Sequence, residues 1–126
     1  MDYAIRQALA TDRTIDIITT GRASGLPRWI ETWIYRVDDR FFLSGSPGKR
    51  DWYANLLAAP RFTVHLKRSV VADLPARATP VTDPAQRRAV MAAILADLSQ
   101  PGDLEAWLAG SPLLEIAFDD GGGAAV

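Results

Sequence analysis

The sequence contains no cysteine and only one histidine, and these two shortages exclude several kinds of chemistry. Without cysteine the chain has no disulfide, no thiolate nucleophile and no thiolate ligand for a metal ion. One histidine cannot by itself build a histidine-rich metal site. We therefore expect neither a metal centre nor thiol chemistry within one chain.

Charge of one sign and long apolar runs are also missing. Fourteen basic and fifteen acidic side chains give a formal net charge of −1. This balance disfavours nucleic acid as a partner, so any cationic site must be local. No apolar run approaches the roughly 18 residues of a membrane-spanning helix, and none follows Met1. We expect a cytoplasmic protein without integral membrane association.

What is present predicts a mainly β protein. Short β-branched or alternating runs, separated by turn residues, predict strands at residues 14–20, 28–37, 40–45, 61–67, 70–81 and 113–118. Alternation is clearest in 61–67, where Phe62, Val64 and Leu66 should face inward. In 70–81, Pro75 and Pro80 indicate an edge strand or a bulge.

Helical patterns lie between and around these strands. They cover residues 3–9, 49–57, a segment that Asp83 should cap and that runs through Leu98, and 103–110. The order shows no regular βαβ alternation, so a doubly wound sheet is disfavoured. We expect an α+β fold, a six-stranded antiparallel barrel with peripheral helices. It should form a single domain over residues 1–126, with 119–126 as a flexible tail.

One stretch, residues 44–60 (SGSPGKRDWYANLLAAP), has the composition of an anion site. It follows an apolar run, turns at two glycines and a proline, and continues as a short helix that ends before Pro60. We expect Lys49 and Arg50 in the first turn of that helix. A helix N-terminus with free N–H groups and adjacent cations attracts anions.

Several other side chains leave two interpretations open. Trp29, Trp33 and Tyr35 share one face of the second strand, which suits a hydrophobic substrate wall or a subunit interface, and hence a homodimer. Glu31, between the two tryptophans, is either exposed or paired with an arginine. The only histidine, His65, should be an exposed strand residue. We interpret the pair at 87–88, two arginines, as a solvated helix face.

Two motifs together resemble a known family. Residues 18–28 (ITTGRASGLPR) and residues 44–60, with DWYANLLAAP, are similar to runs in deazaflavin (coenzyme F420)-dependent nitroreductases. The resemblance implies a split β-barrel related to FMN-binding pyridoxamine-phosphate oxidases. It also implies binding of coenzyme F420, whose reduced form delivers hydride to quinones, nitro compounds or activated double bonds.

The resemblance also implies which residues bind the coenzyme. Its phosphate and glutamate tail needs cations, hydroxyls and backbone N–H groups. The side chains and backbone groups expected at the site are those of Thr20, Arg22, Ser24, Arg28, Ser46, Gly48, Lys49, Arg50, Trp52 and Tyr53. The two aromatic residues could form a wall for the ring or simply hold the helix in place. No side chain is expected to act as a catalyst, since the coenzyme carries the hydride chemistry.

The sequence also departs from the family pattern. Ala23 and Leu26 stand where many members carry basic residues, which leaves fewer cations for a polyanionic tail. FMN is therefore the alternative cofactor, on an FMN-binding split-barrel oxidoreductase. A non-catalytic flavin or deazaflavin carrier is a third interpretation. A barrel that binds another anionic ligand, or a protein through its aromatic face, is a fourth.

Overall fold

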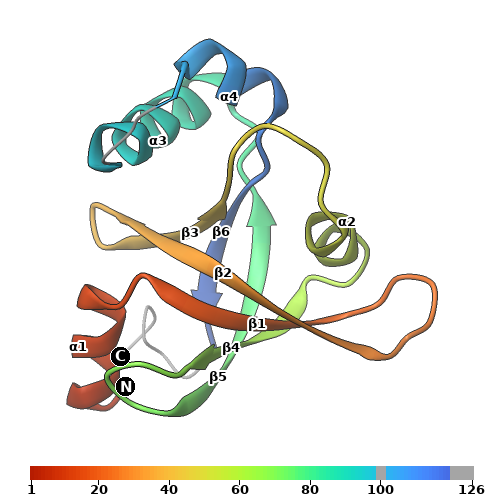
Figure 1. The fold of residues 1–126 in the computed structure, drawn as a ribbon, viewed down its shortest axis with the longest axis vertical. Coiled ribbons are helices and arrows are strands. Elements are labelled where there is room, and N and C mark those ends of the chain that lie inside the picture. Colours follow the sequence, from red (N-terminus) through yellow and green to blue (C-terminus); the bar gives the residue numbers. More distant parts are fainter. Residues whose placement is uncertain (99–101, 120–126) are drawn as a thin grey trace.

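The computed structural model describes residues 1–98 and 102–119, and its centre is a closed antiparallel barrel of six strands (Figure 1). The strands are β1 (Thr14–Thr20), β2 (Pro27–Val37), β3 (Arg40–Ser44), β4 (Arg61–Leu66), β5 (Ala72–Pro80) and β6 (Leu113–Phe118). They close in the order β1-β2-β3-β6-β5-β4. The helices are α1 (Tyr3–Thr11), α2 (Asp51–Ala58), α3 (Pro84–Asp97) and α4 (Leu104–Gly110). The predicted six-stranded barrel with peripheral helices is confirmed.

Alternation along the strands fills the barrel with apolar side chains. In β4, Phe62, Val64 and Leu66 are buried as predicted, and their neighbours on the strand are more exposed. Ile17 of β1 pairs with Val64, which joins the first strand to the fourth within the same interior cluster. Period-two patterning thus places one face of each strand in the core.

A second apolar cluster lies outside the barrel wall, under α3 and α4. Tyr35 of β2 and Phe42 of β3 pack there with Met91, Ile94 and Trp107 of the two helices. Figure 1 shows α3 and α4 side by side over one end of the barrel. The start of α3 is as predicted: Asp83 caps it, accepting from the Gln86 N–H at 2.9 Å, and Pro84 is its first residue.

The fifth strand corrects one prediction. β5 is not an edge strand, because β4 pairs with it over residues 72–77 and β6 pairs with it over residues 76–80. Pro75 is tolerated because it precedes the β6 ladder, and Pro80 is tolerated because it ends the strand. Barrel closure therefore gives β5 a partner strand on each side, with Pro75 just before the β6 ladder and Pro80 at its end.

The start of α2 corrects the prediction that Lys49 and Arg50 lie in the first turn of this helix. The helix begins at Asp51, so Lys49 precedes it and Arg50 occupies the N-cap position with extended backbone. Gly48 has a φ of +143°, a conformation that L side chains rarely adopt. The chain therefore turns at Gly48 and enters the helix two residues later than the charge pattern indicated.

The β1–β2 hairpin extends beyond the barrel. Its two strands pair from Thr14 opposite Trp33 to Thr20 opposite Pro27, but β4 pairs with β1 only over residues 16–18. The end of the hairpin is therefore a two-stranded ribbon, which Figure 1 shows projecting past the barrel on the side of α2. This ribbon carries the first of the two sequence motifs.

The C-terminal strand ends in an anchored residue. The Asp119 N–H donates to the Pro75 carbonyl at 2.9 Å, and its carboxylate pairs with Arg61 at 2.9 Å. The rest of the predicted tail, 120–126, lies outside the described residues. Within residues 1–98 and 102–119 no helix has the length and apolar character needed to cross a membrane.

Candidate functional site

The two sequence motifs meet in a cleft of about 390 Å³ between the end of the β1–β2 hairpin and α2. The hairpin contributes Arg22, Ser24 and Arg28, and the helix contributes Trp52 and Asn55. These segments are separated by more than twenty residues in the sequence, and the barrel brings them together. Four of the residues predicted to bind the coenzyme line this cleft: Arg22, Ser24, Arg28 and Trp52.

A buried asparagine joins the two motifs. The Asn55 side-chain oxygen accepts from the Arg22 backbone N–H at 3.1 Å and from the Arg22 guanidinium at 2.9 Å. The Asn55 amide nitrogen donates to the Thr19 hydroxyl at 3.4 Å. Asn55 and Thr19 are 4% and 2% exposed, so the bonds are shielded from water. Sequence reasoning missed both residues, although an asparagine beside Trp52 and Leu56 on the buried helix face was a signal.

Arg22 also reaches the first turn of α2. Its guanidinium donates to the Asp51 carbonyl at 3.4 Å and pairs with the Asp51 carboxylate at 3.3 Å. The Asp51 side chain is 86% exposed, so this ion pair is weak and easily exchanged for another anion. Asn55 therefore holds the Arg22 side chain in place, and the ion pair with Asp51 adds only a weak contact.

The hairpin turn is shaped by its smallest residues. Gly25 has a φ of +72°, and its N–H donates to the Gly21 carbonyl at 2.8 Å. A Cβ on Gly21 would lie 2.6 Å from the Ser24 hydroxyl oxygen, so a larger residue there would displace the Ser24 side chain. Ser24 accepts from the Leu26 N–H at 3.1 Å and from Arg28 at 3.5 Å. The predicted residues Ser24 and Arg28 are therefore brought together within the turn.

The loop before α2 is organised by Arg50. Its guanidinium donates to the carbonyls of Ser46, at 2.7 Å, and Gly48, at 3.0 Å. It lies so close to Gly45 that a Cβ there would be 2.7 Å from a guanidinium nitrogen. Arg50 therefore stabilises the loop. Among the described residues its guanidinium hydrogen-bonds only to carbonyl oxygens.

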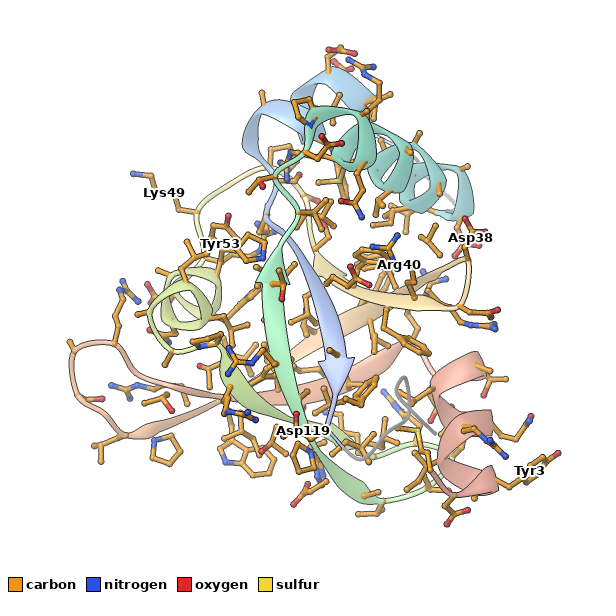
Figure 2. The ribbon with its side chains drawn as sticks, turned by 180° about the vertical axis from the view of Figure 1, so that it is seen from behind. Tyr3, Asp38, Arg40, Lys49, Tyr53 and Asp119 are labelled. Atoms are coloured by element: carbon orange, nitrogen blue, oxygen red, sulfur yellow. The ribbon has the colours of Figure 1, made fainter. Side chains whose placement is uncertain are left out.

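Lys49 differs from Arg50 in being free. Its side chain is exposed, and among the described residues no hydrogen bond or ion pair involves it. Figure 2 shows Lys49 extending from the loop at the side of Tyr53. A second hollow of about 360 Å³ is lined by Arg22, Lys49, Arg50, Asp51 and Tyr53. It adjoins the first cleft, because Arg22 and Asp51 line both.

The remaining predicted residues take different places. Trp52 is 4% exposed and belongs to the barrel core, with its ring edge-on to Tyr53 at 6.3 Å. It nevertheless lines the cleft. Thr20 is exposed and is not among the residues that line the cleft, whereas the preceding Thr19 is. Ser46 is exposed and contributes its carbonyl to Arg50.

The aromatic face of β2 is divided. Trp29 and Trp33 are 57% and 46% exposed, but Tyr35 is buried in the cluster with α3, and burial raises the pKa of its phenol. Trp29 also lines the cleft. The exposed part of the predicted face therefore consists of Trp29 and Trp33, and Trp29 lies at the candidate site.

The polar groups beside these indoles pair with one another. Glu31 is exposed and bonds to Lys67 at 2.6 Å, so its partner is a lysine where an arginine was expected. Lys67 also donates to Asp16 at 2.7 Å, and its hydrogen bonds to the two carboxylates raise the pKa of Lys67. His65 is half-buried, lies edge-on to Trp29 and bonds to Asp73 at 2.6 Å.

Arg87 and Arg88 do not share one role. Arg88 pairs with exposed Glu105 at 3.0 Å, as a solvated helix face would. Arg87 instead donates to the carbonyls of Leu108, at 3.1 Å, and Ser111, at 2.6 Å. The prediction of a solvated pair was therefore wrong for Arg87, which binds the otherwise open carbonyls at the end of α4.

These features define a class of protein, the split β-barrels that include pyridoxamine 5′-phosphate oxidase-like proteins. Within that class the chain belongs to the F420H2-dependent quinone reductase family, whose sequence model matches residues 3–100. The predicted resemblance to deazaflavin-dependent enzymes and the predicted barrel are both confirmed. No curated protein matches the sequence significantly.

Solved structures share the fold at low sequence identity. A conserved hypothetical protein from Mycobacterium tuberculosis is 18% identical, with a TM-score of 0.69 over 94% of this chain and 81% of that chain. An F420 reductase is 17% identical, with a TM-score of 0.59 over 90% of this chain and 92% of that one. A candidate pyridoxamine 5′-phosphate oxidase from Listeria innocua is 10% identical, with a TM-score of 0.64 over 91% and 90%.

Proposed function

We propose that this protein is an oxidoreductase that binds reduced coenzyme F420 and reduces small electron-poor organic acceptors, with quinones as the first class to test. One observation carries the proposal: four cations line the cleft and the hollow at the start of α2, namely Arg22, Arg28, Lys49 and Arg50. Among the described residues that line these two spaces, Asp51 is the only one with a carboxylate. Arg22 alone among the four has an acidic partner within the described residues. Membership of the F420H2-dependent quinone reductase family supports coenzyme F420 as the cofactor.

The donor groups fit the chemistry of the coenzyme tail. A phosphate followed by glutamates needs several charge-assisted hydrogen bonds. Lys49 and Arg28 are cations without carboxylate partners among the described residues, and no side chain caps the N-terminus of α2. The first N–H groups of that helix are therefore available to an anion. We assign Arg22, Arg28 and Lys49 to the tail, and Ser24 and Gly48 to positions where hydroxyl or backbone groups add bonds.

The chain's own residues bind and orient the coenzyme. When bound, the coenzyme supplies a hydride, which carries two electrons. Arg50 holds the loop 45–50 in place, and Asn55 holds Arg22. Trp52 closes one side of the cleft, and Tyr53 lines the adjoining hollow at the start of α2. We assign no acid–base role to any side chain, and we place Thr20 and Ser46 at the rim of the site.

A second candidate has its own support. Ala23 and Leu26 lie at the hairpin turn where a basic residue would strengthen the grip on a long polyanionic tail. A cofactor with a single phosphate, FMN, needs fewer cations. The protein would then be an FMN-binding oxidoreductase, or a carrier if it bound cofactor without turnover.

The test is a fluorescence titration of the protein with coenzyme F420 and, in parallel, with FMN. We expect F420 to bind at micromolar concentration or tighter and FMN more weakly, followed by reduction of quinones by the loaded protein. Lys49→Ala should weaken F420 binding about fivefold at low salt and less at high salt, because salt screens exposed charges.

The matched control is Arg68→Ala, an exposed cation on the turn after β4, remote from α2. It should leave the affinity unchanged. Tighter binding of FMN would select the second candidate. Binding without turnover would select a carrier, and binding of neither cofactor would overturn the proposal.

We also propose that two copies associate through the exposed face of β2. Trp29 and Trp33 are large exposed apolar residues on this strand, and Leu26, at the hairpin turn, is 60% exposed. One solved structure with this fold, 20% identical with a TM-score of 0.57, is described as a domain-swapped dimer. An apolar face of this kind suits a subunit interface.

A further inference from the structure

A third hollow, of about 600 Å³, lies beside the proposed coenzyme site. None of the roles assigned above uses this space. Its walls come from Lys49 and Tyr53 on one side and from the end of α4, residues 109–112, on the other. We call it the α4 pocket. Lys49 and Tyr53 also line the hollow at the start of α2, so the two spaces adjoin.

The loop and α4 are firmly joined around this pocket. The Gly48 N–H donates to the Gly110 carbonyl at 3.0 Å. A Cβ on Gly110 would lie 3.2 Å from Pro47, so the two segments are in close contact. The pocket is therefore a built feature of the fold, with one wall shared with the loop that we assign to the coenzyme.

One residue that lines this pocket, Ser111, carries a buried hydroxyl without a hydrogen-bond partner in the described part of the chain. Ser111 is 5% exposed, and its hydroxyl oxygen is the one buried side-chain polar atom without a hydrogen bond among the described residues. Its backbone is already engaged: the N–H donates to Trp107 at 2.9 Å and the carbonyl accepts from Arg87 at 2.6 Å. A buried polar group left unpaired is costly, which favours a ligand that would pair with it.

The electrostatics of the pocket favour an anion. Arg87 and Lys49 both line it, and neither has a carboxylate partner within residues 1–98 and 102–119. No acidic residue of the described chain lines the pocket, while Thr82 and Tyr53 add hydroxyl groups. Val81, Pro112 and the Tyr53 ring supply apolar walls of the kind that hold a flat organic body.

We propose that the α4 pocket is the subsite for the electron acceptor and that it selects planar acceptors that carry a carboxylate. The Ser111 hydroxyl would donate a hydrogen bond to that carboxylate, and Arg87 would supply the positive field. The binding preference stands on the pocket alone; its role in turnover rests on the proposed function. For a carboxylated quinone the step is balanced. The reduced deazaflavin would give a hydride to the quinone and release one proton to solvent as it becomes oxidised, and the quinone would take one proton from solvent to complete the hydroquinone.

The test compares 1,4-naphthoquinone-2-carboxylate with its neutral carboxamide, which has the same shape. Binding to the protein without coenzyme is measured by calorimetry. We expect the carboxylate to bind about tenfold more tightly, the order of one charge-assisted hydrogen bond. Ser111→Ala should remove most of this preference and leave the melting temperature unchanged or higher, since it deletes an unpaired buried hydroxyl. Thr63→Ala, outside the pocket on β4, should change neither quantity.

The outcomes separate the two proposals. A carboxylate preference that Ser111→Ala abolishes supports the pocket even if coenzyme F420 fails to bind. Equal binding of carboxylate and carboxamide, or a preference that survives Ser111→Ala, overturns the inference even if F420 binds tightly. In the loaded enzyme the same variant should raise the KM for the carboxylate about tenfold and leave kcat within about twofold.

Discussion

At the scale of single residues, Asn55 holds the site together. Its amide oxygen receives two hydrogen bonds from Arg22, and its amide nitrogen reaches Thr19. A buried amide with these partners sets the distance between the hairpin and α2. Removing it leaves the Arg22 N–H and the Thr19 hydroxyl without a partner in a site shielded from water.

We expect Asn55→Ala to lower the free energy of unfolding by about 1–3 kcal/mol, the cost of unpaired buried polar groups. Urea denaturation followed by tryptophan fluorescence measures it. Gln7→Ala, an exposed amide on α1, is the control and should change stability by less than about 0.5 kcal/mol. Equal stability of the two variants would show that the Arg22–Asn55 contact is dispensable.

At the scale of elements, the end of α4 depends on a side chain from α3. Arg87 donates to carbonyls at Leu108 and Ser111, groups that the last turn of a helix leaves without intrahelical partners. Arg88, the next residue, makes only an ion pair with Glu105 between two exposed side chains. Neighbouring arginines on one helix thus contribute differently to the fold.

The two arginines make a matched pair of variants. Arg87→Met should lower the free energy of unfolding by about 1–3 kcal/mol, because part-buried carbonyls lose charged donors. Arg88→Met should cost no more than about 0.5 kcal/mol, as is usual for an exposed ion pair. Chemical denaturation of both variants at the same pH measures the difference. Equal costs would contradict the capping role of Arg87.

The elements also show what the sequence could and could not predict. The alternation of β4 and the cap of α3 are local patterns, and both predictions were confirmed. The start of α2 was misplaced, because Lys49 is a good helix former but the backbone of Gly48 turns the chain. The closure of β5 against β6 was missed, because a proline pattern does not reveal where the opposing ladder begins.

The candidate site shows the same limit of local patterns. The cations at 22, 28, 49 and 50 were found from two local motifs, and the barrel does bring those motifs together. The links that hold them are not local: Asn55 is 33 residues from Arg22. Likewise, Ser111 and Arg87 lie 24 residues apart, and no spacing rule connects them.

At the scale of the whole molecule, the proposed dimer can be tested by size. In Trp33→Glu a charge replaces an exposed indole that we expect to be buried between subunits. Wild-type protein should elute as a dimer at micromolar concentration and Trp33→Glu as a monomer, because burying an unpaired charge is costly. Size-exclusion chromatography with light scattering gives both masses.

The control for this experiment is Tyr3→Glu. Tyr3 is also a large exposed side chain, at 69%, but it lies on α1 (Figure 2). It should leave the mass of the wild type unchanged. A monomeric wild type, or a Trp33→Glu variant that remains dimeric, would remove the β2 face from any subunit contact.

The projecting end of the β1–β2 hairpin has a consequence for binding measurements. A two-stranded ribbon is only marginally stable by itself, and this one is held chiefly through Arg22 and its partners on α2. We therefore expect the end of the hairpin to open locally while the barrel stays folded. A ligand in the cleft would slow hydrogen exchange of the amides from Thr19 to Arg28, including those it does not touch. Its measured affinity includes the cost of ordering the ribbon, so a stiffer hairpin would bind more tightly with no new contact.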